Sequence, residues 1–170
     1  MRDIYPSEST DAADKAFSKA RREAVLRGAW ARARHSPASV RLDSFEDAKS
    51  CLCNLGKVEK IPLGKREVAI SEIVGSVARG RDFDDLFLPL NRDLGDRWKK
   101  VYRAFQRRDS LGDSIPPVSL YLIRGSYFVK DGNHRVSVAR FRGTDVIEAE
   151  ITLLASGRPL PPRPHGGTRT

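Results

Sequence analysis

The stretch YFVKDGNHRVSVARFRG, residues 127–143, decides the fold that we expect for this chain. Its first residues, Tyr, Phe and Val, are typical of a β-strand, whereas Asp131-Gly132 is a turn signal. From Asn133 onward the residues favour a helix, which we expect to stop at Gly143. The chain therefore passes from a strand to a helix at Gly132 and places Asn, His and Arg in the first helical turn.

This corner has the chemistry of an anion site. A helix N-terminus presents backbone N–H groups without partners and the positive end of the helix macrodipole. Gly132 leaves room for a close approach, and His134 and Arg135 add donors, the guanidinium being a fork that matches phosphate. The residue types leave a second interpretation open, in which Asp131 and Asn133 cap the helix and the other side chains lie at the surface.

Two β-like runs and an amphipathic helix precede the corner. Residues 118–123 and 126–131 flank a short turn with glycine and predict a β-hairpin, and residues 145–154 alternate as in a last strand. Residues 94–110 predict a helix whose apolar stripe belongs to the core, and the members of this stripe are Trp98, Val101, Tyr102 and Phe105. Its basic side chains are expected in solvent, with a binding face as the alternative.

The N-terminal part predicts two helices. Residues 11–34 are rich in Ala, Arg and Lys, and Ser44 is an N-cap for a second helix that ends at Gly56. Between Lys15 and Arg34 the bases are Lys15, Lys19, Arg21, Arg22, Arg27, Arg32 and Arg34, against Glu23 alone. This basic face is favoured as a solvated surface, and contact with a nucleic-acid backbone is the alternative.

The middle of the chain is less regular. Residues 57–70 predict one or two strands interrupted by Pro62 and Gly64. Ser71 predicts the start of a short helix over residues 72–78, followed by a loop rich in Arg and Asp. Metal-dependent phosphodiester cleavage needs clustered carboxylates, and the carboxylates Asp82, Asp84 and Asp85 are interpreted as a surface loop, so no metal site is expected.

Size and charge limit the classes of protein to consider. A chain of 170 residues suits one domain, and its net charge of +9 favours an anionic partner such as a nucleotide, a nucleic acid or an acidic protein. No apolar run approaches the roughly 20 residues of a membrane span, and the first 15 residues lack a signal-peptide core, so we expect a cytoplasmic protein. The two cysteines, Cys51 and Cys53, are expected as reduced thiols.

The stretch PPVSLYLIRGSYFVKDGNHRVSVARFRGTDVIEAEI resembles the ParB/sulfiredoxin-like domain. The order of EIVGSVARGRDFDDLFLPL, RWKKVYRAF, IPPVSLY and YFVKDGNHRVSVAR is similar to that in a group of small bacterial proteins labelled ParB-like. The resemblance implies an α+β domain with a small mixed sheet and surrounding helices over residues 57–154. A helical segment over residues 11–56 would precede it, and residues 1–10 and the Pro/Gly-rich tail 155–170 would be disordered.

The resemblance also implies a ligand. In that superfamily a motif at a helix start binds nucleotide phosphates, and Gly132, His134 and Arg135 match it, with Asn133 between them. The implied ligand is a nucleoside triphosphate such as CTP or ATP, bound with or without Mg²⁺. Two further arginines, Arg79 and Arg81, are implied phosphate ligands.

Catalysis is left open by these residues. Asn133 stands where sulfiredoxins carry a reactive Cys, which argues against sulfinic acid repair. The resemblance leaves hydrolysis or transfer of a phosphoryl group open, with His134 and Glu72 as the catalytic candidates. Glu72 is also explained as the acid of a capped helix start. The alternatives are a non-catalytic DNA- or RNA-binding module that uses the basic helices, and a regulatory interaction module.

Overall fold

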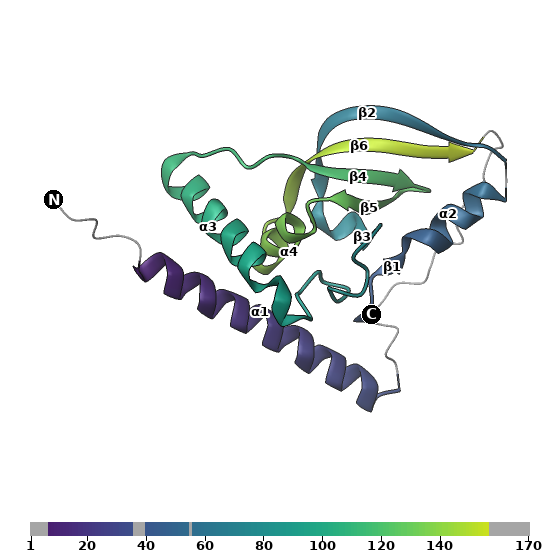
Figure 1. The fold of residues 1–170 in the computed structure, drawn as a ribbon. Coiled ribbons are helices and arrows are strands. Elements are labelled where there is room, and N and C mark those ends of the chain that lie inside the picture. The colour runs from purple at the N-terminus through teal and green to yellow at the C-terminus, as the bar shows by residue number, and fades with distance from the viewer. Residues whose placement is uncertain (1–6, 36–39, 55, 157–170) are drawn as a thin grey trace.

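The computed structural model describes residues 7–35, 40–54 and 56–156, with the side chains from Asp11 onward. The chain forms a six-stranded mixed sheet in the order β1-β3-β5-β4-β6-β2 with helices on both faces (Figure 1), so the predicted α+β class is confirmed. The elements are α1 Ser7–Ala33, β1 Asp43–Ser44, α2 Phe45–Cys53, β2 Val58–Ala69, the 3₁₀ turn η2 Ile70–Glu72, β3 Ile73–Ser76, the 3₁₀ turn η3 Arg92–Leu94, α3 Gly95–Leu111, β4 Val118–Ile123, β5 Ser126–Asp131, α4 Asn133–Phe141 and β6 Val146–Ser156.

The predicted hairpin lies at the centre of the sheet. Strands β4 and β5 pair antiparallel around Arg124 and Gly125, whose φ angles of 50° and 78° suit the tight turn of a hairpin. On one side β5 pairs parallel with β3, and on the other β4 pairs parallel with β6. The last neighbour, β2, is one long strand that pairs antiparallel with β6 and changes register between Pro62 and Gly64.

The helix predicted over residues 72–78 is wrong, because Ile73–Ser76 is strand β3 and Ser71 lies in η2, whose first turn has no side-chain cap. The β-branched residues of this segment suit a strand, and it pairs with β5 on one side and β1 on the other. The pairing is close at Gly75, where an added Cβ would lie 2.4 Å from the Asp43 carbonyl oxygen and 2.7 Å from the Phe128 ring.

Helix α4 lies between the sheet and the other long helices. Its Val136 packs with sheet residues such as Val118 and Val129, whereas Val138 packs with Trp98 of α3 and with alanines of α1. The predicted apolar stripe of α3 is confirmed as core, since Trp98 is fully buried and its indole N–H donates to Ser137 Oγ at 2.8 Å. Six of the nine residues of α4 are buried as a result.

Helix α2 covers the opposite face of the sheet. Its Phe45 and Leu52 pack with Ile123, Phe128 and Leu154, and side chains of successive strand residues point to opposite faces. The predicted cap is confirmed, because Ser44 Oγ accepts the backbone N–H of Asp47 at 3.2 Å. Cys51 and Cys53 of this helix are free and exposed.

The ends of the predicted segments differ from the structure. Helix α1 begins at Ser7 rather than Asp11, and Ala155 and Ser156 continue strand β6. The rest of the two predicted disordered segments, residues 1–6 and 157–170, lies outside the described residues. Within the part of the chain that the structure describes, no helix combines the length and apolar character needed to cross a bilayer.

Candidate functional site

The corner between β5 and α4 requires glycine. Gly132 is the N-cap of α4 with φ 101°, and an added Cβ would lie 2.7 Å from Val118 Cγ1 and 3.0 Å from Arg135 Nε. No side chain caps this helix, so neither Asp131 nor Asn133 acts as a cap. The backbone N–H groups of Asn133 and His134, at the first two positions of the helix, have no intrahelical acceptor.

A small cavity of about 160 Å³ opens at this helix start. It brings together five residues that the sequence predicted as phosphate ligands, namely Arg79, Gly132, Asn133, His134 and Arg135. Asp131 of β5 and Arg97 and Val101 of α3 complete the lining. Arginines from three separate segments therefore converge on the N-terminus of α4.

The cavity is electropositive, because three arginines line it against the one carboxylate of Asp131. His134 also lines it. This side chain is 7% exposed, and its pKa is lowered to about 4, first by burial and then by the positive charges of Arg97 and Arg79, with Asp82 opposing them. His134 is therefore neutral at pH 7. Its ring packs edge-on against Phe83, with the centroids 5.7 Å apart.

Two buried polar atoms lack partners at the cavity floor. Asn133 is 9% exposed, and neither its Oδ1 nor the Nδ1 of His134 makes a hydrogen bond within the described part of the chain. Buried polar side chains are nearly always hydrogen-bonded, so such atoms gather where a protein binds something or stores strain. The two unpaired atoms indicate that the first turn of α4 does more than pack against its neighbours.

Arg135 lines the cavity, but most of its donors already have partners within the protein. Its Nη1 donates to the carbonyl oxygens of Pro116 and Pro117, at 2.7 Å each, and its Nη2 pairs with Asp131 Oδ2 at 2.7 Å. The guanidinium thus ties the start of β4 to the corner. Most of its fork is occupied by protein acceptors, so its main effect is to position the cavity wall.

Arg79 and Arg97 are the arginines with capacity to bind an anion. Arg79 makes one ion pair, from Nη1 to Asp82 Oδ2 at 2.9 Å, and its side chain is 44% exposed. Arg97 is exposed and makes no ion pair with any residue that the structure describes. The helical pattern of residues 94–110 predicts that Arg97 lies on the charged face of its helix. It does not predict that Arg97 reaches the start of α4, because that position depends on the packing of α3 on α4.

Two predicted site residues lie elsewhere. Arg81 lines a neighbouring hollow of about 650 Å³, which shares Arg79 with the small cavity and also borders β1, Phe45 and Ser76. Glu72 is exposed on η2 and lines neither space. The structure therefore does not bring Glu72 to the candidate site, and it gives Arg81 a peripheral position.

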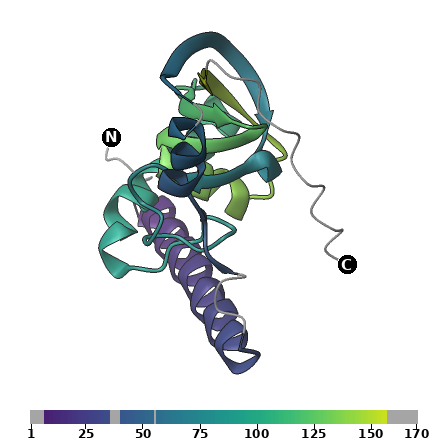
Figure 2. The ribbon, with the colours of Figure 1, turned by 90° about the vertical axis from the view of Figure 1, so that its right-hand side faces the viewer.

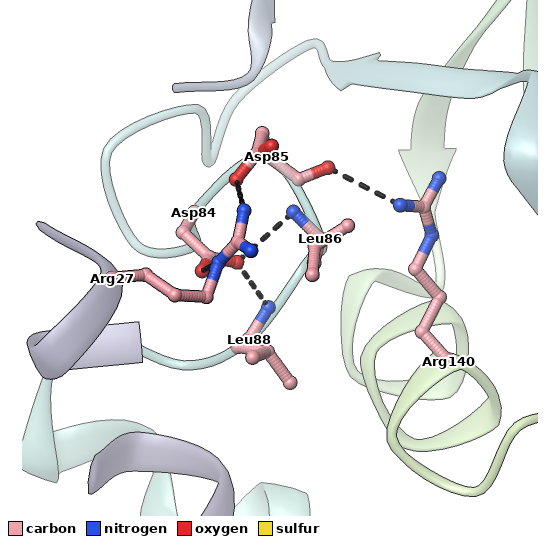
Figure 3. A network of polar contacts seen from close by, with 6 residues as sticks. All are labelled: Arg27, Asp84, Asp85, Leu86, Leu88 and Arg140. Atoms are coloured by element: carbon pink, nitrogen blue, oxygen red, sulfur yellow. Dashed lines mark hydrogen bonds and ion pairs between the residues drawn. The ribbon is translucent and has the colours of Figure 1, made fainter. Parts of the chain in front are cut away.

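The interpretation of Asp84 as a surface residue is wrong, because it is 1% exposed. Figure 3 shows its carboxylate accepting the backbone N–H groups of Leu86 at 3.0 Å and Leu88 at 2.8 Å and pairing with Arg27 of α1. Burial raises the pKa of Asp84 above its ordinary value. Asp84 therefore stabilises the loop that follows Arg79. Within the described residues, no three His, Cys, Asp or Glu side chains form a metal-binding group.

The same loop is held from its other side by α4. Arg140 donates to the carbonyl oxygen of Asp85 at 3.2 Å and to those of Ile70 and Ile73 at 2.6 and 2.9 Å, and Arg27 also pairs with Asp85 at 2.6 Å (Figure 3). The loop is therefore fixed between α1 and α4. This fixes the course of the chain on which Arg79 and Asp82 stand.

Comparison with known proteins gives one similar structure. No family model matches the chain, and no curated protein matches it. The crystal structure of sulfiredoxin from Arabidopsis thaliana aligns with 18% identity and a TM-score of 0.36, over 51% of this chain and 82% of that one. At this TM-score the structural likeness carries no argument about the function of this chain.

Proposed function

We propose that this chain binds the phosphate groups of a nucleotide in the cavity at the start of α4. The observation that carries the proposal is the convergence of Arg79 and Arg97 on the free backbone N–H groups of Asn133 and His134 around one cavity of about 160 Å³. Backbone donors, the helix macrodipole and arginines are the groups that bind phosphate in proteins. The resemblance of this stretch to the nucleotide-binding motif of ParB/sulfiredoxin-like domains supports the same ligand.

The dimensions support a divided site. A volume of about 160 Å³ is below the roughly 300–1,000 Å³ of pockets that enclose a whole small molecule. The adjoining hollow of about 650 Å³ shares Arg79 and includes Arg81. We therefore propose phosphates in the cavity and the nucleoside over the hollow, with Arg79 at the boundary between them.

Binding without an assigned reaction is the function that the geometry supports best. General acid–base catalysis works best with a pKa near the working pH, whereas the pKa of His134 is about 4. A neutral imidazole suits hydrogen bonding better than proton transfer here. Glu72 lines neither space, so hydrolysis or phosphoryl transfer has no catalytic residue to which we assign it.

Isothermal titration calorimetry with CTP, ATP, GTP and ADP, with and without Mg²⁺, tests this proposal. Arg97→Ala removes a charge-assisted contact worth about 1.5–3 kcal/mol, so we expect affinity to fall roughly 10- to 100-fold. Lys100→Ala, which removes an exposed charge from the same helix, is the matched control and is expected to bind normally. Absence of binding at millimolar nucleotide, or equal affinities of the two variants, would refute the proposal.

A further inference from the structure

Helix α1 carries a cluster of exposed apolar side chains that the candidate site does not use. Val25, Leu26 and Trp30 are 43%, 52% and 65% exposed. Single exposed apolar residues are normal in a soluble protein, but a group on one helix marks an interaction surface. Leu26 and Trp30 are four residues apart and so form a ridge along the helix.

A hollow adjoins this cluster. It measures about 490 Å³ and lies between α1, through Phe17, Val25 and Leu26 among others, and Arg92 of η3. The C-terminal half of α1 extends away from the sheet in both views (Figures 1 and 2), and the exposed fractions of Val25, Leu26 and Trp30 show that this part of its surface is open to solvent. The hollow and the Leu26–Trp30 ridge together make a surface about 20 Å long at 1.5 Å per residue, which we term the α1 groove.

The rim of the α1 groove is positively charged. Arg21, Arg22 and Arg92 line the hollow, and none of the three makes an ion pair with another described residue. Arg21 Nε is also buried without a hydrogen-bond partner within the described residues. By contrast, Lys15 and Arg27 of the same helix are paired with aspartates. The charges of Arg21, Arg22 and Arg92 therefore remain available to pair with an acidic partner.

We infer that the α1 groove docks an acidic amphipathic helix of a partner protein. Carboxylates on such a helix would pair with the rim arginines, and its apolar ridge would pack beside Leu26 and Trp30 as helices do when ridges fit grooves. A nucleic acid would satisfy the arginines but would leave Val25 and Leu26 without apolar contacts. A protein helix satisfies both features of the surface.

Charge disfavours a second copy of this chain and its segment 157–170 as occupants. In a two-fold dimer the same patch meets itself, which would bring Arg21, Arg22 and Arg92 against their own copies. The segment 157–170 contains Arg158, Arg163 and Arg169 and no acidic residue, so like charges would oppose its docking as well. The partner is therefore a separate acidic chain.

The two tryptophans give a direct assay. Trp98 is fully buried and Trp30 is 65% exposed, so docking should shift the fluorescence of Trp30 alone to shorter wavelength. The probe is a synthetic helical peptide of about 18 residues, five helical turns, with Leu along one face and Glu elsewhere, and a scrambled peptide of equal composition is its control. We expect the amphipathic peptide to bind at least ten times more tightly than the scrambled one.

Variants of the intact chain locate the binding. Leu26→Ser is expected to weaken the amphipathic peptide at least tenfold, whereas Leu111→Ser, which alters another exposed leucine at the far end of α3, should change nothing. Equal affinity for both peptides would overturn the inference, since it would show attraction by charge alone. It would also be overturned by a single-stranded oligonucleotide that binds more tightly than the peptide and is indifferent to Leu26→Ser, or by a dimer that this substitution dissociates in sedimentation.

Discussion

Acidification is expected to destabilise this protein through His134. The pKa of this side chain is lowered to about 4 in the folded protein by burial and by Arg97 and Arg79, whereas an unfolded chain keeps the ordinary value of 6.5. Because the folded pKa is the lower one, the unfolded state binds more protons between these values and stability falls as the pH falls. The contribution of His134 to the free energy of unfolding is fully present above pH 6.5, and it is lost as the pH falls from 6.5 to 4.

The size of this effect follows from the difference between the two pKa values. One pKa unit corresponds to about 1.4 kcal/mol, so the difference costs about 3 kcal/mol when the pH is below both values and about 2 kcal/mol at pH 5. Such a loss is a large part of the roughly 5–15 kcal/mol by which domains are stable. His134 is therefore expected to dominate the weakly acidic range, above the pH at which most carboxylates titrate.

Urea unfolding at pH 7.5 and pH 5 measures this contribution. Wild type is expected to lose about 2 kcal/mol more between the two pH values than His134→Gln, since glutamine is polar and does not titrate. The difference between the two proteins cancels the effect of acidic residues common to both. An equal loss in both proteins, or an imidazole that titrates above pH 6 by NMR, would refute the reasoning.

Two further predictions concern the corner and the loop. Gly132→Ala combines a left-handed backbone with a Cβ 2.7 Å from Val118 Cγ1 and should lower the free energy of unfolding in urea by about 3 kcal/mol. Its control is Gly80→Ala, whose Cβ meets no atom within 4 Å and which should change this free energy by less than about 0.5 kcal/mol. Similar values for both variants would contradict the close approach at Gly132. Arg27→Ala leaves Asp84 buried without its charged partner. We expect the free energy of unfolding to fall by about 2 kcal/mol, less than the roughly 3–5 kcal/mol of a fully buried pair, because the Arg27 side chain is one-third exposed. Arg32→Ala on the exposed side of the same helix is its control, and an equal loss of thermal stability would show that the ion pair contributes nothing.

Features that depend on neighbours along the chain were predictable. The hairpin, the glycine at the corner and the helix over residues 133–141 follow from residues that touch each other locally, and the structure confirms them. The stripe of α3 is likewise a local periodicity, and Trp98 lies in the core as expected.

Features that depend on distant contacts were not predictable. Residues 73–76 form a strand because β5, about fifty residues later, pairs with them in parallel. The run DFDD appears hydrophilic in the sequence, yet Asp84 is buried, where it pairs with Arg27 of α1, a residue 57 positions earlier in the chain. The hydrogen bonds from Arg135 to two proline carbonyls were not predictable either, because nothing in the local pattern shows them.

The place of β2 in the sheet has a consequence for biosynthesis. Among the strands that the structure describes, β2 neighbours β6 alone, and their ladder joins Val58 to Ser156 and Ala69 to Val146. A nascent chain therefore carries residues 58–69 without a pairing partner until residues 146–156 have left the ribosome, at a synthesis rate of about 5–20 residues per second. During those seconds the charges of Lys60, Lys65 and Arg66 and the interruption at Pro62 protect the segment from pairing with other chains.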